Sequence, residues 1–166
     1  MARPTHHVAQ LNVGRLLEPL DSPRLAGFVS ALEPINALAD SAPGFVWRLQ
    51  TDEGDATAIR VYDDEMMIVN MSVWESIEAL AAFVYKGPHV EVMRQRRAWF
   101  EHLKEAYTAL WWLPAGELPS LEDAKRRLEH LRRHGPTEIA FGFKRPFPPP
   151  DGARAPTVDG GWLCPA

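Results

Sequence analysis

The sequence contains only one cysteine, Cys164, among its 166 residues. A lone thiol can neither close a disulfide within the chain nor supply a cysteine-rich zinc site, so disulfide scaffolds and zinc ribbons are excluded. No apolar run approaches the length of a membrane span, and the N-terminal segment MARPTHHVAQ lacks the apolar core of a signal peptide. These absences predict a cytoplasmic protein with no membrane partner.

The chain also lacks an excess of positive charge and the common phosphate-binding motifs. Its formal net charge is -4, which argues against nucleic acid as a partner. No glycine-rich phosphate loop, Walker sequence or GxSxG turn is present. Hydrophobic residues make up 46% of the chain and charged residues 24%, which is the composition of an ordinary globular domain.

The hydrophobic periodicity predicts alternating strands and helices in a single α+β domain over residues 1–146. A Pro/Gly-rich C-terminal arm follows over residues 147–166. Pro34 is expected to kink or divide the first helix. The predicted strands are 6–17, 45–50, 58–62, 65–74, 108–114 and 139–144, and the predicted helices are 22–40, 76–86, 88–107 and 120–135.

This order predicts a ferredoxin-like antiparallel sheet with the helices on one face. A sheet that is covered on one side leaves its other face in need of a partner. We therefore expect a homodimer.

The stretch GPHVEVMRQRRAWF, from Gly87 to Phe100, places two polar side chains on an apolar helix face. With an advance of ~100° per residue, Arg96 and Met93 lie within ~40° of His89 around the predicted helix. Trp99 flanks the same stripe, which also holds Val92, Phe100, Leu103 and Tyr107. His89 and Arg96 therefore face the sheet across a space that is partly polar.

Two interpretations of this pair stay open. A histidine in a core is often a satisfied packing residue, and Arg96 could bind backbone carbonyls or a carboxylate such as Asp63 or Glu75. In the functional interpretation, a neutral His89 acts as a base or a ligand. Alternate strand positions supply polar and aromatic groups for the same space, namely Gln10, Asn12, Asn70, Ser72 and Trp74.

Two further pairs carry less information. His130 and His134 are four residues apart on a helix, but no third metal ligand accompanies them, so we expect a solvated helix end. Trp111 and Trp112 place one indole on each face of their strand, where they serve as packing or as a stacking wall for a flat ligand.

From Val69 to Arg94 the sequence VNMSVWESIEALAAFVYKGPHVEVMR resembles the dimeric α+β-barrel superfamily. That superfamily includes the antibiotic biosynthesis monooxygenases and the haem-degrading monooxygenases. The longer pattern, with RxxWF and WWLPAGELPS, resembles an uncharacterised bacterial subfamily and spans His7 to Pro146.

The resemblance implies a ligand between the sheet and the helices of each subunit. His89 matches the iron-binding histidine of the haem-degrading members, and Asn12 is the candidate for their first-strand asparagine. Their helix tryptophan has no match in ALAAFVY, which argues against haem degradation but not against haem binding. The cofactor-free members use Asn, Trp and Arg to hold a phenolic substrate that reacts directly with oxygen.

Our leading hypothesis is an oxygenase-like enzyme, a cofactor-independent monooxygenase, that acts on a small aromatic or polyketide-like metabolite. The expected catalytic residues are His89, Arg96 and Asn70. The expected substrate-binding residues are Asn12, Trp74, Met93, Trp99, Phe100 and Trp112. One alternative is a haem-binding protein with His89 as axial ligand, without any other protein metal ligand. The other alternative is a non-catalytic small-ligand binder or a structural dimer.

Overall fold

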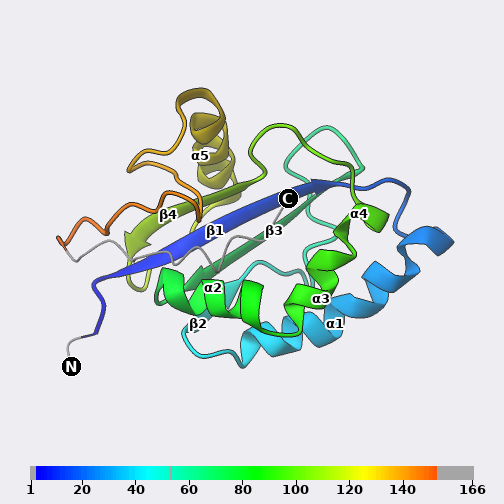
Figure 1. The fold of residues 1–166 in the computed structure, drawn as a ribbon, viewed down its shortest axis with the longest axis horizontal. Coiled ribbons are helices and arrows are strands. Elements are labelled where there is room, and N and C mark those ends of the chain that lie inside the picture. The colour runs from blue at the N-terminus through cyan, green and yellow to red at the C-terminus, as the bar shows by residue number, and fades with distance from the viewer. Residues whose placement is uncertain (1–2, 53, 153–166) are drawn as a thin grey trace.

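The computed structural model describes residues 3–52 and 54–152, which form one antiparallel sheet with helices on both of its faces (Figure 1). None of the helices in these ranges combines the length and the hydropathy that a membrane span needs. The strands are β1 (His6–Arg15), β2 (Phe45–Arg48), β3 (Met67–Trp74) and β4 (Thr108–Pro114). The helices are η1 (Pro23–Leu25), α1 (Ala26–Asp40), α2 (Ile77–Lys86), α3 (His89–Arg94), α4 (Arg96–Trp99) and α5 (Leu121–His134).

The strand order β2-β3-β1-β4, with every neighbouring pair antiparallel, confirms the predicted ferredoxin-like α+β sheet. Each half of the chain supplies a strand, a helical crossover and a second strand, and the strands of the two halves interleave in the sheet. The predicted helix starts are also confirmed, because Ser76 Oγ accepts from the Ala79 amide and Ser120 Oγ accepts from the Asp123 amide. α1 runs through Pro34 as one helix.

The sheet buries both of its faces, and this corrects the expectation that all helices lie on one face. α5 packs Ala124, Leu128 and Leu131 against the face that carries Leu11 and Trp111. α1 to α4 lie on the opposite side (Figure 1). The covering of the α5 face removes the free apolar face from which we expected a homodimer.

Two predicted strands are not formed as strands. Residues 58–62 form an irregular, bent segment, and its apolar side chains Ile59, Val61 and Tyr62 pack against the core beneath α5. Residues 139–144 contribute one isolated bridge, in which Phe141 and Leu110 exchange both backbone hydrogen bonds. The chain then turns at Gly142, so the pairing does not extend. Hydrophobic alternation in both segments reflects one-sided burial rather than a ladder.

The predicted helix over 88–107 is also wrong in its second half. Its first half divides at Gln95 into α3 and α4, and α4 ends at Trp99. Phe100 is extended, with φ -122° and ψ 147°, and forms a bridge with Leu16. A Cβ on Gly14 would lie 2.7 Å from Cδ1 of Phe100, so β1 accepts this close approach because it carries glycine there. Tertiary pairing thus overrides the helical periodicity of the segment.

The first residues of the predicted C-terminal arm contact the domain. Trp112 Nε1 donates to the Phe147 carbonyl at 2.8 Å, and the Phe147 ring packs 5.9 Å from that of Phe141. Residues 153–166 of the arm lie outside the described residues.

Candidate functional site

A cavity of about 740 Å³ lies between the sheet face opposite α5 and the helices α1, α2 and α3. Its floor is the even-numbered face of β1 and its partner β3. Eight of the nine residues predicted to form the site line this cavity, namely Asn12, Asn70, Trp74, His89, Met93, Arg96, Trp99 and Phe100. The strand alternation and the helical spacing thus brought residues to one cavity, while their part in binding or catalysis stays a prediction.

Trp112 is the predicted site residue that does not line the cavity. It lies on the expected face of β4, but its indole packs beside Val8, Leu110 and Phe147 at the edge of the sheet. The indole N–H is already satisfied by the Phe147 carbonyl. The alternation along β4 gave its face correctly and could not give its distance from the cavity.

The floor of the cavity carries a connected set of polar side chains. Gln10 is only 9% exposed and Ser72 only 7%. Gln10 Nε2 donates to Asn70 Oδ1 at 2.7 Å and to Ser72 Oγ at 3.2 Å. Trp74 Nε1 donates to the same Ser72 oxygen at 2.9 Å. Buried polar groups thus satisfy one another below the cavity, while Asn70 itself is exposed toward it.

Asn12 stands next to Asn70 on the same floor, because the two residues are register partners on β1 and β3. Asn12 Nδ2 donates to Thr108 Oγ1 at 3.0 Å. The two neighbouring amides are therefore each held by a different strand neighbour, Asn70 by Gln10 and Asn12 by Thr108.

His89 begins α3 at the helix side of the cavity. Its Nδ1 lies 3.4 Å from the Val84 carbonyl oxygen. A carbonyl can only accept, so Nδ1 carries the proton and Nε2 keeps its lone pair. Burial lowers the pKa of His89, the Val84 carbonyl opposes this in part, and the charge of Arg96 adds a still smaller lowering. His89 is therefore a neutral imidazole with a basic nitrogen at neutral pH.

Arg96 is a half-buried cation without a carboxylate partner. None of the ion pairs within residues 3–52 and 54–152 includes it, so the partners suggested by sequence, Asp63 and Glu75, do not bind it. Arg96 donates one hydrogen bond within the described part of the chain, to the Val13 carbonyl at 3.4 Å. The guanidinium lies 4.6 Å from the ring centroid of Tyr107 and 5.0 Å from that of Phe100.

Burial lowers the pKa of Arg96, which reports the cost of holding this charge away from water. The carboxylates of Asp64 and Glu101 are both bound by another arginine, Arg15. An anionic atom in the cavity would therefore find in Arg96 a guanidinium that no carboxylate of residues 3–52 and 54–152 neutralises.

An aromatic wall closes one side of the cavity. The rings of Trp74 and Phe83 stack at 5.2 Å, and Phe45 meets Trp74 edge-on at 5.4 Å. Phe83 also lies 5.2 Å from the His89 ring. A flat apolar ligand would face ring surfaces on this side and polar groups on the sheet.

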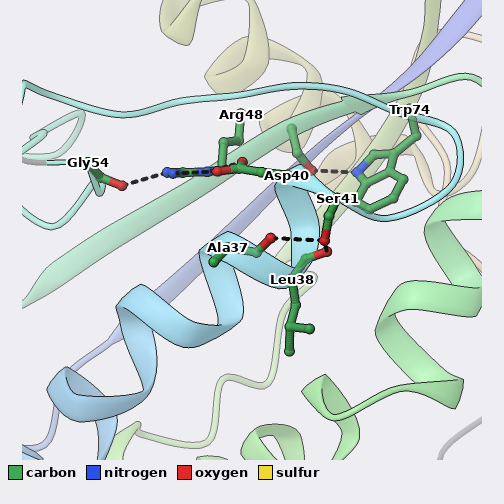
Figure 2. A network of polar contacts seen from close by, with 8 residues as sticks. Ala37, Leu38, Asp40, Ser41, Arg48, Gly54 and Trp74 are labelled. Carbon is green, nitrogen blue, oxygen red and sulfur yellow. Dashed lines mark hydrogen bonds and ion pairs between the residues drawn. The ribbon is translucent and has the colours of Figure 1, made fainter.

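Sequence reasoning missed Arg48, which also lines the cavity. Its side chain is 12% exposed and binds Asp40 at the end of α1, with Nε to Oδ1 at 2.7 Å and a second nitrogen to Oδ2 at 3.2 Å. A third contact reaches the Gly54 carbonyl at 2.6 Å (Figure 2). Unlike Arg96, this arginine is fully engaged, and it ties α1 to the loop after β2. No local sequence motif predicts these contacts, because the partners of Arg48 come from two different segments.

A family model matches residues 7–157, which is nearly the whole chain, under the description "Domain of unknown function (DUF3291)". The chain belongs to the DUF3291 family. This confirms the resemblance to an uncharacterised family, and the match extends beyond the predicted domain end at residue 146 into the arm. No curated protein matches the chain.

Solved structures with a similar course of the chain were found at low sequence identity. The oxygenase SnoaB from Streptomyces nogalater, described as cofactor-independent, is 18% identical, with 68% of this chain and 95% of that chain covered and a TM-score of 0.45. A putative antibiotic biosynthesis monooxygenase from Chloroflexus aurantiacus is 18% identical, with 69% and 98% covered and a TM-score of 0.38. A protein of unknown function from Nitrosomonas europaea is 12% identical, with 70% and 98% covered and a TM-score of 0.42.

Proposed function

We propose that this member of the DUF3291 family is an oxygenase-like enzyme that acts on a small aromatic or polyketide-like metabolite in the cavity. The observation that carries the proposal is the pairing of a neutral His89 with an unneutralised Arg96 around one cavity. A base next to a fixed positive charge is the arrangement that removes a proton and keeps the resulting anion.

In this mechanism His89 Nε2 takes a proton from an acidic C–H or O–H group of the substrate. Arg96 stabilises the enolate or phenolate that forms, and Asn70 and Asn12 hold the substrate's oxygen atoms. The electron-rich anion then reacts with molecular oxygen, which is the oxidant. For a methylene group the balance is a CH₂ and O₂ converted to a C=O and H₂O. The aromatic wall of Trp74 and Phe83 positions the rings and excludes water.

The proposal is tested by oxygen uptake with dithranol, an enolisable dihydroxyanthrone, as substrate. His89→Ala and Arg96→Leu should each lower the enzymatic rate by about a hundredfold or more, because each removes a group that acts in the transition state. Arg94→Leu and His102→Ala are matched controls, since both side chains are exposed and do not line the cavity. Rates in the two site variants that equal those of the controls would refute the assignment.

Haem binding is a second candidate, and the state of His89 favours it. A ligating histidine usually donates its second ring N–H to a carbonyl, and Val84 supplies that carbonyl here. His89 would hold the iron, and Arg96 would pair with a propionate. When bound, the haem would supply oxygen activation or electron transfer. Among the described residues, no group of three or more His, Cys, Asp or Glu side chains could hold a metal ion by itself.

Titration with haemin separates the two candidates. If His89 is the axial ligand, the wild type should show a shifted Soret band that His89→Ala changes. An absence of any shift, or an identical shift in the variant, would leave the cofactor-independent reading as the enzyme hypothesis.

We further propose that the protein is a homodimer, as the resemblance to the dimeric α+β barrels implies. Because α5 covers the sheet face that would otherwise pair, the two copies would meet through another surface. Light scattering at micromolar concentration tests this, and a mass of one chain would refute it.

A non-catalytic small-ligand binder would have the same cavity without turnover. A purely structural role predicts a closed interior, which does not fit the cavity beside His89.

A further inference from the structure

We infer that Gln10 fixes the orientation of the Asn70 side-chain amide in the cavity floor. The ligand then places a carbonyl or anionic oxygen against Asn70. The inference deepens the proposed function, on which it rests for the identity of the site. It assigns Gln10 as a positioning residue and oxygen-acceptor groups as the ligand chemistry at Asn70.

The orientation of the Asn70 amide follows from which of its atoms already form hydrogen bonds. Gln10 uses its Nε2 twice, toward Asn70 Oδ1 at 2.7 Å and toward Ser72 Oγ at 3.2 Å. The acceptor end of the Asn70 amide is therefore engaged beneath the cavity. Its donor end, Nδ2, has no partner among the hydrogen bonds of the described residues and belongs to a side chain that lines the cavity.

The orientations of the two amides are coupled. If Gln10 turned over alone, its Oε1 would face Asn70 Oδ1, and two acceptors would oppose each other. Ser72 connects the pair to Trp74. The Trp74 Nε1, which can only donate, donates to the same Ser72 oxygen at 2.9 Å. Gln10 is only 9% exposed, so water has little access to satisfy a reversed amide.

The charge around the floor points to the same ligand chemistry. Arg96 adds donors to the cavity and has no carboxylate partner, while the other cavity guanidinium, Arg48, is engaged by Asp40 and Gly54. A ligand oxygen placed against the Asn70 amide would thus meet its Nδ2 donor, because its Oδ1 is bound by Gln10. A ligand amine in the same place would meet donors and find no acceptor on Asn70.

Two neutral bicyclic probes separate these cases by binding alone. Coumarin carries an exocyclic carbonyl that accepts, and β-naphthylamine carries an amino group in the corresponding place that donates. The wild type should bind coumarin about tenfold more tightly than β-naphthylamine. Coumarin gains one hydrogen bond from the Asn70 amide, whereas the amine places a donor against a donor. Fluorescence or calorimetric titration gives both dissociation constants.

Gln10→Glu is the decisive variant, because a carboxylate only accepts and forces Asn70 to turn its Nδ2 downward. The preference for coumarin should then fall by about tenfold and approach or cross equality. Gln95→Glu makes the same chemical change on an exposed side chain outside the cavity and should keep the wild-type preference. Asn70→Asp is a second variant on an exposed side chain, which removes the donor without altering Gln10 and should also abolish the preference.

The inference is overturned if the wild type binds the two probes equally or binds neither, or if both Gln10→Glu and Asn70→Asp keep the wild-type ratio. Neither probe needs to react with oxygen. A protein that shows the probe preference but no oxygen uptake would therefore lose the proposed enzymatic function and keep the assigned floor.

Discussion

The two faces of the sheet differ in what the same strands present to them. On β1, Ala9, Leu11 and Val13 point toward α5 and are at most 1% exposed. The residues between them, Gln10 and Asn12, point toward α1 to α4 and carry amides. One face belongs to an apolar core that stabilises the fold. The other face carries polar side chains that form the floor of the cavity. The candidate site thus lies on one side of a sheet whose other side packs against α5.

The largest expected effect on stability comes from a substitution in the apolar core between the sheet and α5. Leu128→Ala removes a fully buried side chain of α5 and should lower the free energy of unfolding by ~3 kcal/mol, because lost apolar burial adds to the cost of the cavity left behind. Urea denaturation measures the change. Leu118→Ala, at a side chain that is 58% exposed, is the control and should change stability by less than ~0.5 kcal/mol. Similar losses in both variants would contradict the assignment of the core.

The next effect sits at the boundary between strand and cavity. Gly14→Ala should destabilise the protein by ~2 kcal/mol, since the new Cβ would lie 2.7 Å from Cδ1 of Phe100 and 3.5 Å from a guanidinium nitrogen of Arg96. Thermal unfolding reports it. Gly142→Ala is matched, because a Cβ there meets nothing within 4 Å. If the two alanines behave alike, Phe100 is not packed against β1 as described.

A smaller effect is expected from Arg96→Leu on stability. The substitution removes the cost of a half-buried, unpaired cation but also its contacts with Phe100 and Tyr107, so the two changes offset to within ~1 kcal/mol. Urea denaturation beside Leu128→Ala gives the contrast between the faces. A loss as large as that of Leu128→Ala would mean that Arg96 serves the fold rather than a ligand.

The smallest effect is a pH dependence. Because the pKa of His89 is lowered in the folded protein, the unfolded chain binds a proton there first as the pH falls below about 6.5. His89 therefore contributes no pH dependence above that value and makes the protein less stable below it. Relative to His89→Gln, the wild type should lose stability between pH 7.5 and pH 5.5 in urea titrations. A constant difference between the two proteins would show that the imidazole is not held neutral by burial.

The sequence indicated the faces more reliably than the contacts. Strand alternation put Asn12, Asn70 and Trp74 on one face, and helical spacing put His89 and Arg96 opposite them, because both periods follow from local backbone geometry. The end of α4 at Trp99 could not be predicted, since it depends on a pairing between Phe100 and Leu16 that are far apart in the chain. Interactions between distant elements decide such points, and local propensity does not record them.

The same limit applies within the site. Arg96 has no carboxylate partner within residues 3–52 and 54–152, whereas Arg15 binds both Asp64 and Glu101, and helical spacing could not distinguish the two arginines. The position of Trp112 depends on the arm, whose Phe147 carbonyl accepts from its indole. Alternation gave the face of each side chain, whereas its partners had to come from the folded structure.

The central claim is that the cavity is a ligand site built around the unneutralised Arg96, and the affinity for α-naphthoate tests it most directly. This probe is flat and carries one carboxylate. Wild type and Arg94→Leu, whose substitution is on the exposed side of the same segment, should bind it alike. Arg96→Leu should bind it at least about tenfold more weakly, because a charge-assisted pair is lost. Equal dissociation constants for all three proteins, or no binding by the wild type, would contradict the claim.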